Sequence, residues 1–460
     1  MANTYISRSI SGSPTNPDKF TISMWVKRCG LGAEQSLMGQ YASSNFRGKL
    51  SFLADDRIEY IQKNDGNTTA NLITTRKFRD TNAWYHIVVQ FDTSQGTDSN
   101  RIKIYINGTQ ETAFDTTSYP AQDLDMRLNQ ASGTLCIGQD GNGGNYCDLL
   151  LSHVHLVDGA TEAPTVFGSQ DATTGEWNIK TSPTISEYGD DGFFVLKDGN
   201  SVTDQSGKSN NFTVGGGTLT KTQDNPSNNF TNLNFLFEQG GTNSNFTHGN
   251  CTGQSRSAQG GAGTSTFGVS SGKFYAEFKQ SAESAANEGS IAVVDSYFIS
   301  NNQGLGGSSS PGYFEYSVGC FGLRNSTTPV TYYSSSGAKA TSSNTHAGWS
   351  NGDIIMIALD MDNSRVYFGK NGQWNASNTW SSATPSQYIT IDSTNFTGTM
   401  HFGVGDSSGG NHVTWQCNFG NGFFGTTAVA TEGTNASNNG IFEYDVPTGY
   451  TALSTKGLNL

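Results

Sequence analysis

The chain has 460 residues, a net charge of −13 and only 14% charged residues. Nucleic-acid binding needs clustered Lys and Arg that neutralise phosphates, so this composition argues against it. Its 56 glycines, 27 phenylalanines and 18 tyrosines are typical of many short strands joined by turns, and we expect an all-β protein. The longest apolar run, residues 354–359, is too short to cross a bilayer, so we expect no membrane insertion.

The first third of the chain contains strand patterns. Residues 20–27 alternate apolar and polar side chains, as a half-buried strand does. Residues 84–91 give another apolar strand, and residues 102–106 lead into Asn107-Gly108, a pair that suits a tight hairpin turn. We expect a first β-sandwich over residues 1–170.

Residues 171–250 are rich in Asn, Gly, Asp and Thr and contain one apolar run. Such a length without structure is unusual inside a compact protein, so we expect an ordered connector. The segment contains two Asn-Asn-Phe motifs. We expect Phe212 and Phe230, which end these motifs, to anchor the connector to one or both sandwiches.

We expect a second sandwich over residues 251–430 and a C-terminal tail over residues 431–460. The apolar strand 354–359 enters a polar turn, and the next strand ends at Lys370-Asn371-Gly372, again a hairpin signal. Residues 400–405 and 413–420 resemble the closing strands of SPRY domains.

Six cysteines occur without any Cys-x-x-Cys spacing, and the N-terminus has no apolar signal-peptide core. We therefore expect synthesis in a reducing cytoplasm with the thiols reduced and most of them buried. A bond between Cys136 and Cys147 is the alternative.

The sequence gives little support for catalysis. Glycoside hydrolysis needs two carboxylates flanking the bond, and neither sandwich contains an alternating acidic triplet. We predict that the chain is not an enzyme.

Metal or cofactor binding has equally little support. Asp360, Asp362 and Ser364 begin like a calcium loop, but Arg365 stands where such a loop needs Gly, which excludes an EF-hand. We therefore expect no cofactor or metal, with Ca²⁺ at Asp140 in the glycine-rich loop 140–145 as the alternative.

Several aromatic side chains flank turn-rich segments instead of lying inside alternating strands. They either form a binding surface or pack under long loops, because large aromatic residues are usually buried. The glycine-rich loop offers further polar contacts. The candidate ligand-binding residues are Tyr332, Tyr333, Trp349, Trp374, Trp380, Asn142, Asn145 and Tyr146.

Several motifs resemble known families. The order FTISMWVK, WYHIVVQFD, IKIYINGT and IGQDGNGGNYCDLLLSHVHLVDG is similar to laminin-G-like, concanavalin-type domains, although Leu149-Leu150 replaces their usual Gly-aromatic pair. SGKFYAEF and GDIIMIALDMDNSRVYFGKNGQW resemble SPRY domains. Between them, DQSGKSNNF and DNPSNNF resemble a connector of phage structural proteins. The resemblances imply two concanavalin-like antiparallel β-sandwiches (jelly rolls) joined by an ordered connector.

These resemblances also imply a role. We expect a non-enzymatic protein of the virion surface, a head fibre, decoration protein or tail-fibre component assembled in the host cytoplasm. Its expected partners are other virion proteins and a host-surface carbohydrate or receptor. A homo-oligomer would assemble through sandwich faces or edges. The alternatives are a polysaccharide-degrading glycoside hydrolase of concanavalin-like fold and a cellular adhesin, which the missing signal peptide disfavours.

Overall fold

The structure is a computed structural model that describes residues 3–237, 245–255, 262–284, 288–301, 314, 317–326, 329–343, 346–406 and 412–459. The chain divides into two compact units. The first contains Met1–Lys221 and Asn225–Ser227, and the second contains Thr222–Asp224 and Asn228–Leu460. Within the described residues, no helix has the length and apolar character that a membrane crossing requires.

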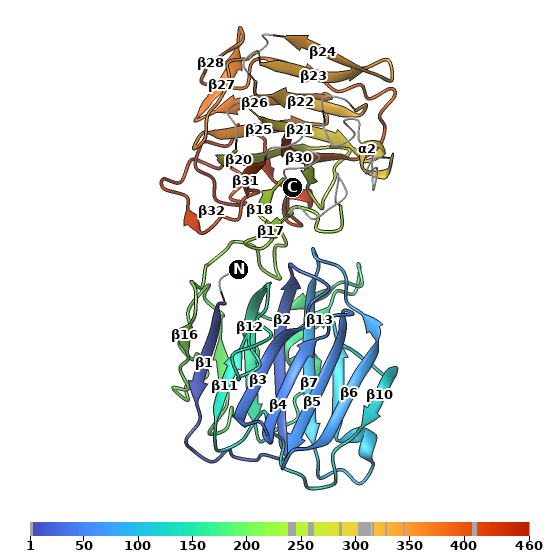
Figure 1. The fold of residues 1–460 in the computed structure, drawn as a ribbon, viewed down its shortest axis with the longest axis vertical. Coiled ribbons are helices and arrows are strands. Elements are labelled where there is room, and N and C mark those ends of the chain that lie inside the picture. The colour runs from blue at the N-terminus through green and yellow to red at the C-terminus, as the bar shows by residue number, and fades with distance from the viewer. Residues whose placement is uncertain are drawn as a thin grey trace. The chain divides into compact units, whose positions relative to one another are not determined.

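The first unit is a sandwich of two antiparallel sheets, whose strands Figure 1 shows in blue to green. The eight-stranded sheet runs in the order β10 (Phe114–Ser118), β6 (Asn67–Lys77), β5 (Arg57–Asn64), β4 (Phe46–Phe52), β3 (Gln35–Ser43), β11 (Thr134–Ile137), β1 (Tyr5–Ser9) and β16 (Thr213–Gly215). The six-stranded sheet runs in the order β15 (Phe193–Val195), β12 (Leu149–Asp158), β2 (Lys19–Arg28), β7 (Trp84–Asp92), β8 (Ile102–Ile106) and β9 (Thr109–Gln110).

Small elements cover the outer face of the six-stranded sheet. The short helix α1 (Pro164–Phe167) leads into the hairpin β13 (Gly168–Gln170) and β14 (Trp177–Ile179). The Trp177 ring stacks on His86 of β7 at 6.0 Å, and its Nε1 donates to His86 Nδ1 at 3.0 Å. Because both faces are covered, β2 is buried along nearly its whole length.

The segment expected as a connector belongs to both units. β15 pairs with β12, β16 pairs with β1, and Phe212 lies in the core of the first unit. Phe230 lies in an apolar cluster of the second unit. The first unit thus extends beyond the expected boundary at residue 170, because its apolar run Phe193–Val195 completes a sheet. Residues 238–244 of this segment lie outside the described residues.

The second unit also contains two large sheets, which are antiparallel except for one short parallel pairing. The larger has the order β17 (Asn245–Thr247), β18 (Thr252–Gln254), β31 (Val413–Asn418), β20 (Lys273–Glu283), β25 (Ile354–Asp360), β26 (Arg365–Lys370), β27 (Gln373–Ala376) and β28 (Thr379–Ser382), while β29 (Tyr388–Thr390) pairs with β26 and β34 (Thr451–Ala452) pairs in parallel with β20. The smaller has the order β19 (Ala262–Thr264), β30 (Met400–Asp406), β21 (Gly289–Asp295), β22 (Cys320–Arg324), β23 (Val330–Ser335) and β24 (Ala338–Ser343). The helix α2 (Ser296–Asn301) follows β21, and β32 (Phe423–Phe424) pairs with β33 (Thr427–Ala428).

The C-terminal tail covers the outer face of the larger sheet. Phe442, Val446 and Tyr450 pack there against Tyr275 and Trp374. The carboxylate of Glu277 accepts the backbone N–H groups of residues 443 and 444, both at 2.8 Å. Every residue of β25 is therefore buried, because the core lies on one face and the tail on the other.

The structure confirms the expected all-β fold. Both predicted Asn-Gly hairpins are present, with φ of 49° and 78° at Asn107 and Gly108 and of 49° and 83° at Asn371 and Gly372. Positive φ at both central residues is the geometry that makes Asn-Gly favourable at such turns.

Candidate functional site

Three of the aromatic candidates belong to the core, so the expectation that they line binding loops is wrong for them. Tyr332 is 1% exposed, and its hydroxyl bonds Ser290 Oγ at 3.0 Å. Trp349 is 3% exposed, and its Nε1 donates to Gln280 Oε1 at 2.7 Å. Trp374 is equally buried, because the tail covers its face of the sheet. Each indole or phenol therefore stabilises the interior.

Trp380 and Tyr333 are half-buried. Trp380 lies on β28, where its Nε1 donates to the carbonyl of Gly348 at 3.3 Å and its ring approaches His346 at 5.9 Å. Trp380 is thus packed beneath a loop. Tyr333 on β23 lines an open groove and remains available to a ligand.

This groove, which we call the edge groove, lies where the edges of the two sheets of the second unit meet. Its walls come from β22, β23 and β24 on one side and from β26, β27 and β29 on the other, and loop 391–395 completes it. Its volume is about 800 Å³. Ligand sites typically have volumes of a few hundred to a thousand cubic ångströms, so the edge groove is large enough for a small molecule or a short chain.

The groove combines an apolar floor with a polar rim. Buried Leu323, Phe368 and Ile391 form part of the floor. The rim carries uncharged hydroxyl and amide side chains, and these belong to Ser335, Ser336, Ser342, Gln387, Thr390, Ser393, Thr394 and Asn395. Such a surface can pack against C–H groups and hydrogen-bond to hydroxyls of the same ligand.

Tyr388 supplies an exposed ring at the groove. It is 44% exposed, which is unusual for so large an apolar surface. The guanidinium of Arg365 lies 4.3 Å from its ring centroid, and the Tyr367 ring meets it edge-on at 5.6 Å. These contacts hold the ring in place, so its exposed surface is ordered before a ligand arrives. Sequence analysis missed Tyr388, because nothing around this short strand marks it as exposed.

Asp392 fixes one wall of the groove. Its carboxylate accepts the backbone N–H of Gly337 at 3.2 Å and the Asn395 side-chain amide at 2.9 Å. Burial alone would raise the pKa of Asp392, but these hydrogen bonds lower it below its ordinary value. The charged carboxylate therefore ties the β23–β24 turn to loop 391–395 at neutral pH.

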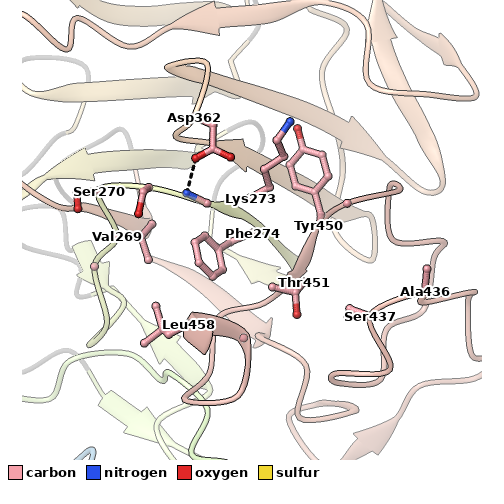
Figure 2. Close-up of a pocket in the computed structure, with 15 residues that line it drawn as sticks. Val269, Ser270, Lys273, Phe274, Asp362, Ala436, Ser437, Tyr450, Thr451 and Leu458 are labelled. Carbon is pink, nitrogen blue, oxygen red and sulfur yellow. Dashed lines mark hydrogen bonds between the residues drawn. The ribbon is translucent and has the colours of Figure 1, made fainter. Parts of the chain in front are cut away.

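A second hollow, of about 670 Å³, lies where the tail meets the start of β20 (Figure 2). Val269, Phe274 and Leu458 provide its apolar surface. Asp362 accepts the Gly272 backbone N–H at 2.7 Å, which fixes the loop at its rim (Figure 2). Its lysine, Lys273, forms an ion pair with Asp360 at 2.9 Å.

The glycine-rich loop of the first unit uses its carboxylate internally. Asp140 Oδ1 accepts the backbone N–H groups of Asn142 at 2.8 Å and Gly144 at 3.0 Å. The Asn145 amide donates to Glu34 at 3.2 Å, and Tyr146 packs near Tyr5. In the described part of the chain, no three His, Cys, Asp or Glu side chains are grouped to hold a metal. Asp140 thus shapes a turn, and its Oδ2 also accepts the Asn145 amide at 3.4 Å. Ca²⁺ binding at this loop stays a prediction.

Two carboxylates of the first unit, those of Glu34 and Glu59, approach the same lysine, an arrangement that the sequence does not suggest. Lys49 on β4 forms ion pairs with Glu34 and with Glu59 of β5, the latter at 3.8 Å. Burial raises the pKa of Glu59, and the Lys49 ammonium opposes that rise. The pairing of β4 with β5 would have suggested the Lys49–Glu59 contact. Glu34 precedes β3, so its approach to Lys49 depends on the tertiary fold and could not be predicted from the sequence.

One family model matches most of the first unit. The family described as the concanavalin A-like lectin/glucanases superfamily (Laminin_G_3) matches residues 2–167. No curated protein matches the chain. The SPRY domain of human HERC1 is 16% identical, with 40% of this chain and 96% of that chain covered and a TM-score of 0.29. Domains LG4-5 of the mouse laminin alpha1 chain are 10% identical, with 94% and 92% covered and a TM-score of 0.28. A SAP-like pentraxin from Limulus polyphemus is 14% identical, with 47% and 90% covered and a TM-score of 0.27.

Proposed function

We propose that the chain is a non-enzymatic adhesion protein of a virion surface, and that its second unit holds an oligosaccharide in the edge groove. The first unit has a concanavalin-like fold of the lectin/glucanase type. Because fold alone does not fix function, the proposal depends on the groove itself.

The observation that carries the proposal is the ordered, 44% exposed ring of Tyr388 beside a rim of hydroxyl and amide groups. The apolar face of a pyranose stacks on such a ring, while its hydroxyls exchange hydrogen bonds with Ser, Thr and Asn side chains. Tyr333 contributes a second aromatic surface from the opposite sheet.

The virion assignment is supported by the sequence. The motifs DQSGKSNNF and DNPSNNF, and the order of the two sandwiches around them, resemble phage structural proteins. The proposed partners are therefore host-surface glycan and neighbouring virion proteins, with a homo-oligomer as one form of assembly. Mass spectrometry and immunogold labelling of purified particles test this assignment, and absence of the chain from intact particles would refute it.

A binding role fits the carboxylates of the groove better than hydrolysis does. Of the described residues that line it, Asp392 is the single acid, and its oxygens already hold Gly337 and Asn395. Glycoside hydrolysis needs a second carboxylate across the scissile bond.

The glycoside hydrolase alternative is favoured by one observation, the approach of Glu34 and Glu59 to the same lysine in the first unit. Measuring new reducing ends from host polysaccharide, with Glu59→Gln as the comparison, decides between the two. Release that disappears in Glu59→Gln would establish the enzyme and reject the binding-only proposal.

Tyr388→Ala tests the groove directly. We expect affinity for the recognised glycan to fall about tenfold, as loss of an aromatic contact of 1–2 kcal/mol does, while the melting temperature changes little. Tyr388→Phe should retain most of the binding. Tyr297→Ala removes a tyrosine that is 49% exposed outside the groove and serves as the matched control. Equal binding by Tyr388→Ala and the unmodified chain on a glycan array would reject the groove as the site.

A further inference from the structure

Two buried cysteines of the second unit face each other across neighbouring strands. β18 pairs antiparallel with β31 in a register that sets Thr252 opposite Gln416 and Gly253 opposite Trp415. One step further along the same register, Cys251 lies opposite Cys417. The backbone N–H of Cys417 donates to the carbonyl of Cys251 at 2.7 Å, while the N–H of Cys251 donates to the carbonyl of His248 in the turn before β18.

The geometry of such a pair suits a disulfide bond. Directly opposite residues that share a backbone hydrogen bond in an antiparallel ladder have Cα atoms about 5.5 Å apart. Disulfides usually join Cα atoms about 4.4–6.8 Å apart. Their side chains also emerge on the same face of the sheet. The Cβ atoms of a hydrogen-bonded pair are about 5.5 Å apart, so closing the bond requires the two strands to approach each other by about 1 Å.

The other four cysteines lack this arrangement. Cys136 on β11 lies opposite Ser7 and Gly39, and Cys320 on β22 lies opposite Val294. The backbone N–H of Cys29 donates to Asp148, and Cys147 Sγ donates to the carbonyl of Ser36 at 2.9 Å. The structure holds all six as thiols, and Cys417 is fully buried while Cys251 is 8% exposed.

We propose that Cys251 and Cys417 form a disulfide bond when the protein is exposed to an oxidising environment. The two S–H bonds break, one S–S bond forms, and two protons and two electrons pass to an oxidant such as molecular oxygen or an oxidised low-molecular-weight thiol. The bond joins Cys251, which immediately precedes β18, to Cys417 of β31, the strand next to β20.

Burial makes this reaction slow in the folded protein. The pKa of the Cys417 thiol is raised well above its ordinary value, first by burial and then by the neighbouring Cys251. The thiolate is the reactive form, so oxidation depends on transient opening of the β17–β18 hairpin at the edge of the sheet. The bond therefore forms after folding and outside a reducing cytoplasm, and it constrains an already assembled sheet.

Peptide mapping under non-reducing conditions tests the proposal. The full chain is purified under reducing conditions, incubated with oxidised glutathione, and alkylated before digestion. We expect a cross-linked peptide pair containing Cys251 and Cys417, with a loss of two hydrogen masses that a reductant reverses. The oxidised protein should melt at least about 5 °C higher than the reduced protein, because the bond closes a long loop.

Two variants separate this pair from general oxidation. Cys251→Ser should abolish both the cross-link and the oxidation-dependent rise in melting temperature, and Cys320→Ser should leave both unchanged. Cys417→Ala gives the same test from the other strand without adding a polar group to the buried site. A different cysteine pairing would overturn the proposal. Full alkylation of both residues after prolonged oxidation would also overturn it, if it is found both in the native protein and in protein that has been unfolded and refolded.

Discussion

Single residues set the local geometry of both units, and the glycine of the first predicted hairpin illustrates this. Gly108 has a φ of +78°, in the left-handed region that side chains with a Cβ disfavour. A Cβ at this position would also lie 2.4 Å from Cζ3 of Trp177, the residue that covers β7. The turn and the packing of the β13–β14 hairpin therefore both require glycine here.

We expect Gly108→Ala to lower the free energy of unfolding of the first unit by about 2–4 kcal/mol, because it combines backbone strain with overpacking. Chemical denaturation followed by tryptophan fluorescence measures the change. Gly96→Ala is the matched control, since a Cβ there meets nothing within 4 Å, and its effect should stay within about 0.5 kcal/mol. Equal stabilities of the two variants would show that Trp177 does not pack as the structure has it.

Trp349 gives a second test at the scale of residues, because a core role and a binding role predict opposite effects of its removal on stability. Its ring packs in the core near Trp415 and His346. Trp349→Ala should destabilise the second unit by about 3–5 kcal/mol, as loss of a large buried side chain does. Trp380 is half-buried, so Trp380→Ala should lower the unfolding free energy by less in the same denaturation experiment. A variant Trp349→Ala with unchanged stability and lost attachment would restore this residue as a binding residue.

At the scale of elements, the tail explains which parts of the structure could be predicted from the sequence. Alternating strands and Asn-Gly turns depend on neighbours along the chain, so the hairpins at Asn107 and Asn371 were predictable. The burial of Trp374 was not, because the tail that covers it comes from far along the sequence. The continuous apolar run of β25 was the available signal, since such runs mark strands covered on both faces.

The edge groove was unpredictable for the same reason. Tyr333 and Tyr388 come from different sheets, and Asp392 joins a turn at Gly337 to a loop more than fifty residues later. The turn residues around Tyr333 are the signal that makes it a candidate. The sequence could not identify Tyr388, whose exposure follows from its place at a sheet edge.

The anchoring of the tail by Glu277 leads to a prediction about pH. Burial raises the pKa of Glu277, and the hydrogen bonds from the N–H groups of residues 443 and 444 lower it. Burial is the larger effect, and the resulting pKa is about 7. Because this folded-state pKa exceeds that of the unfolded chain, about 4.3, folding favours the protonated form. The stabilising contribution of Glu277 is therefore fully present below about pH 4.5 and is lost as the pH rises through 7.

We expect this loss to amount to about 1–3 kcal/mol of unfolding free energy. Burial lowers the pKa values of His346 and His401, so these residues make the second unit more stable as the pH rises. The effect of Glu277 is therefore measured as the difference in unfolding free energy between the unmodified chain and Glu277→Gln. That difference should shrink from pH 4.5 to pH 7 in urea denaturation. Glu443→Gln, which changes a carboxylate in the tail itself, is the control. A difference that does not vary with pH would contradict the raised pKa of Glu277.

For the whole molecule, the structure indicates two units that each bury their own core. Every hydrophobic cluster among the described residues draws its members from one unit, and residues 222–228 carry the chain between them. A unit of this kind contains the apolar contacts that it needs to fold alone. We therefore expect fragments 1–221 and 222–460 to fold separately.

Each fragment should give a β-type circular dichroism spectrum with helix content far below a quarter of its residues, and a cooperative thermal transition. Residues 222–224 stay with the second fragment, because the N–H of Gln223 donates to the carbonyl of Asn421 and Asp224 Oδ1 accepts the N–H of Phe230. Fragment 1–170 is the informative comparison: it lacks β15, β16 and Phe212, so it should melt lower than fragment 1–221 or fail to fold. If fragments 1–170 and 1–221 were equally stable, residues 171–221 would be a connector after all, and their strand pairing would contribute nothing to the first unit.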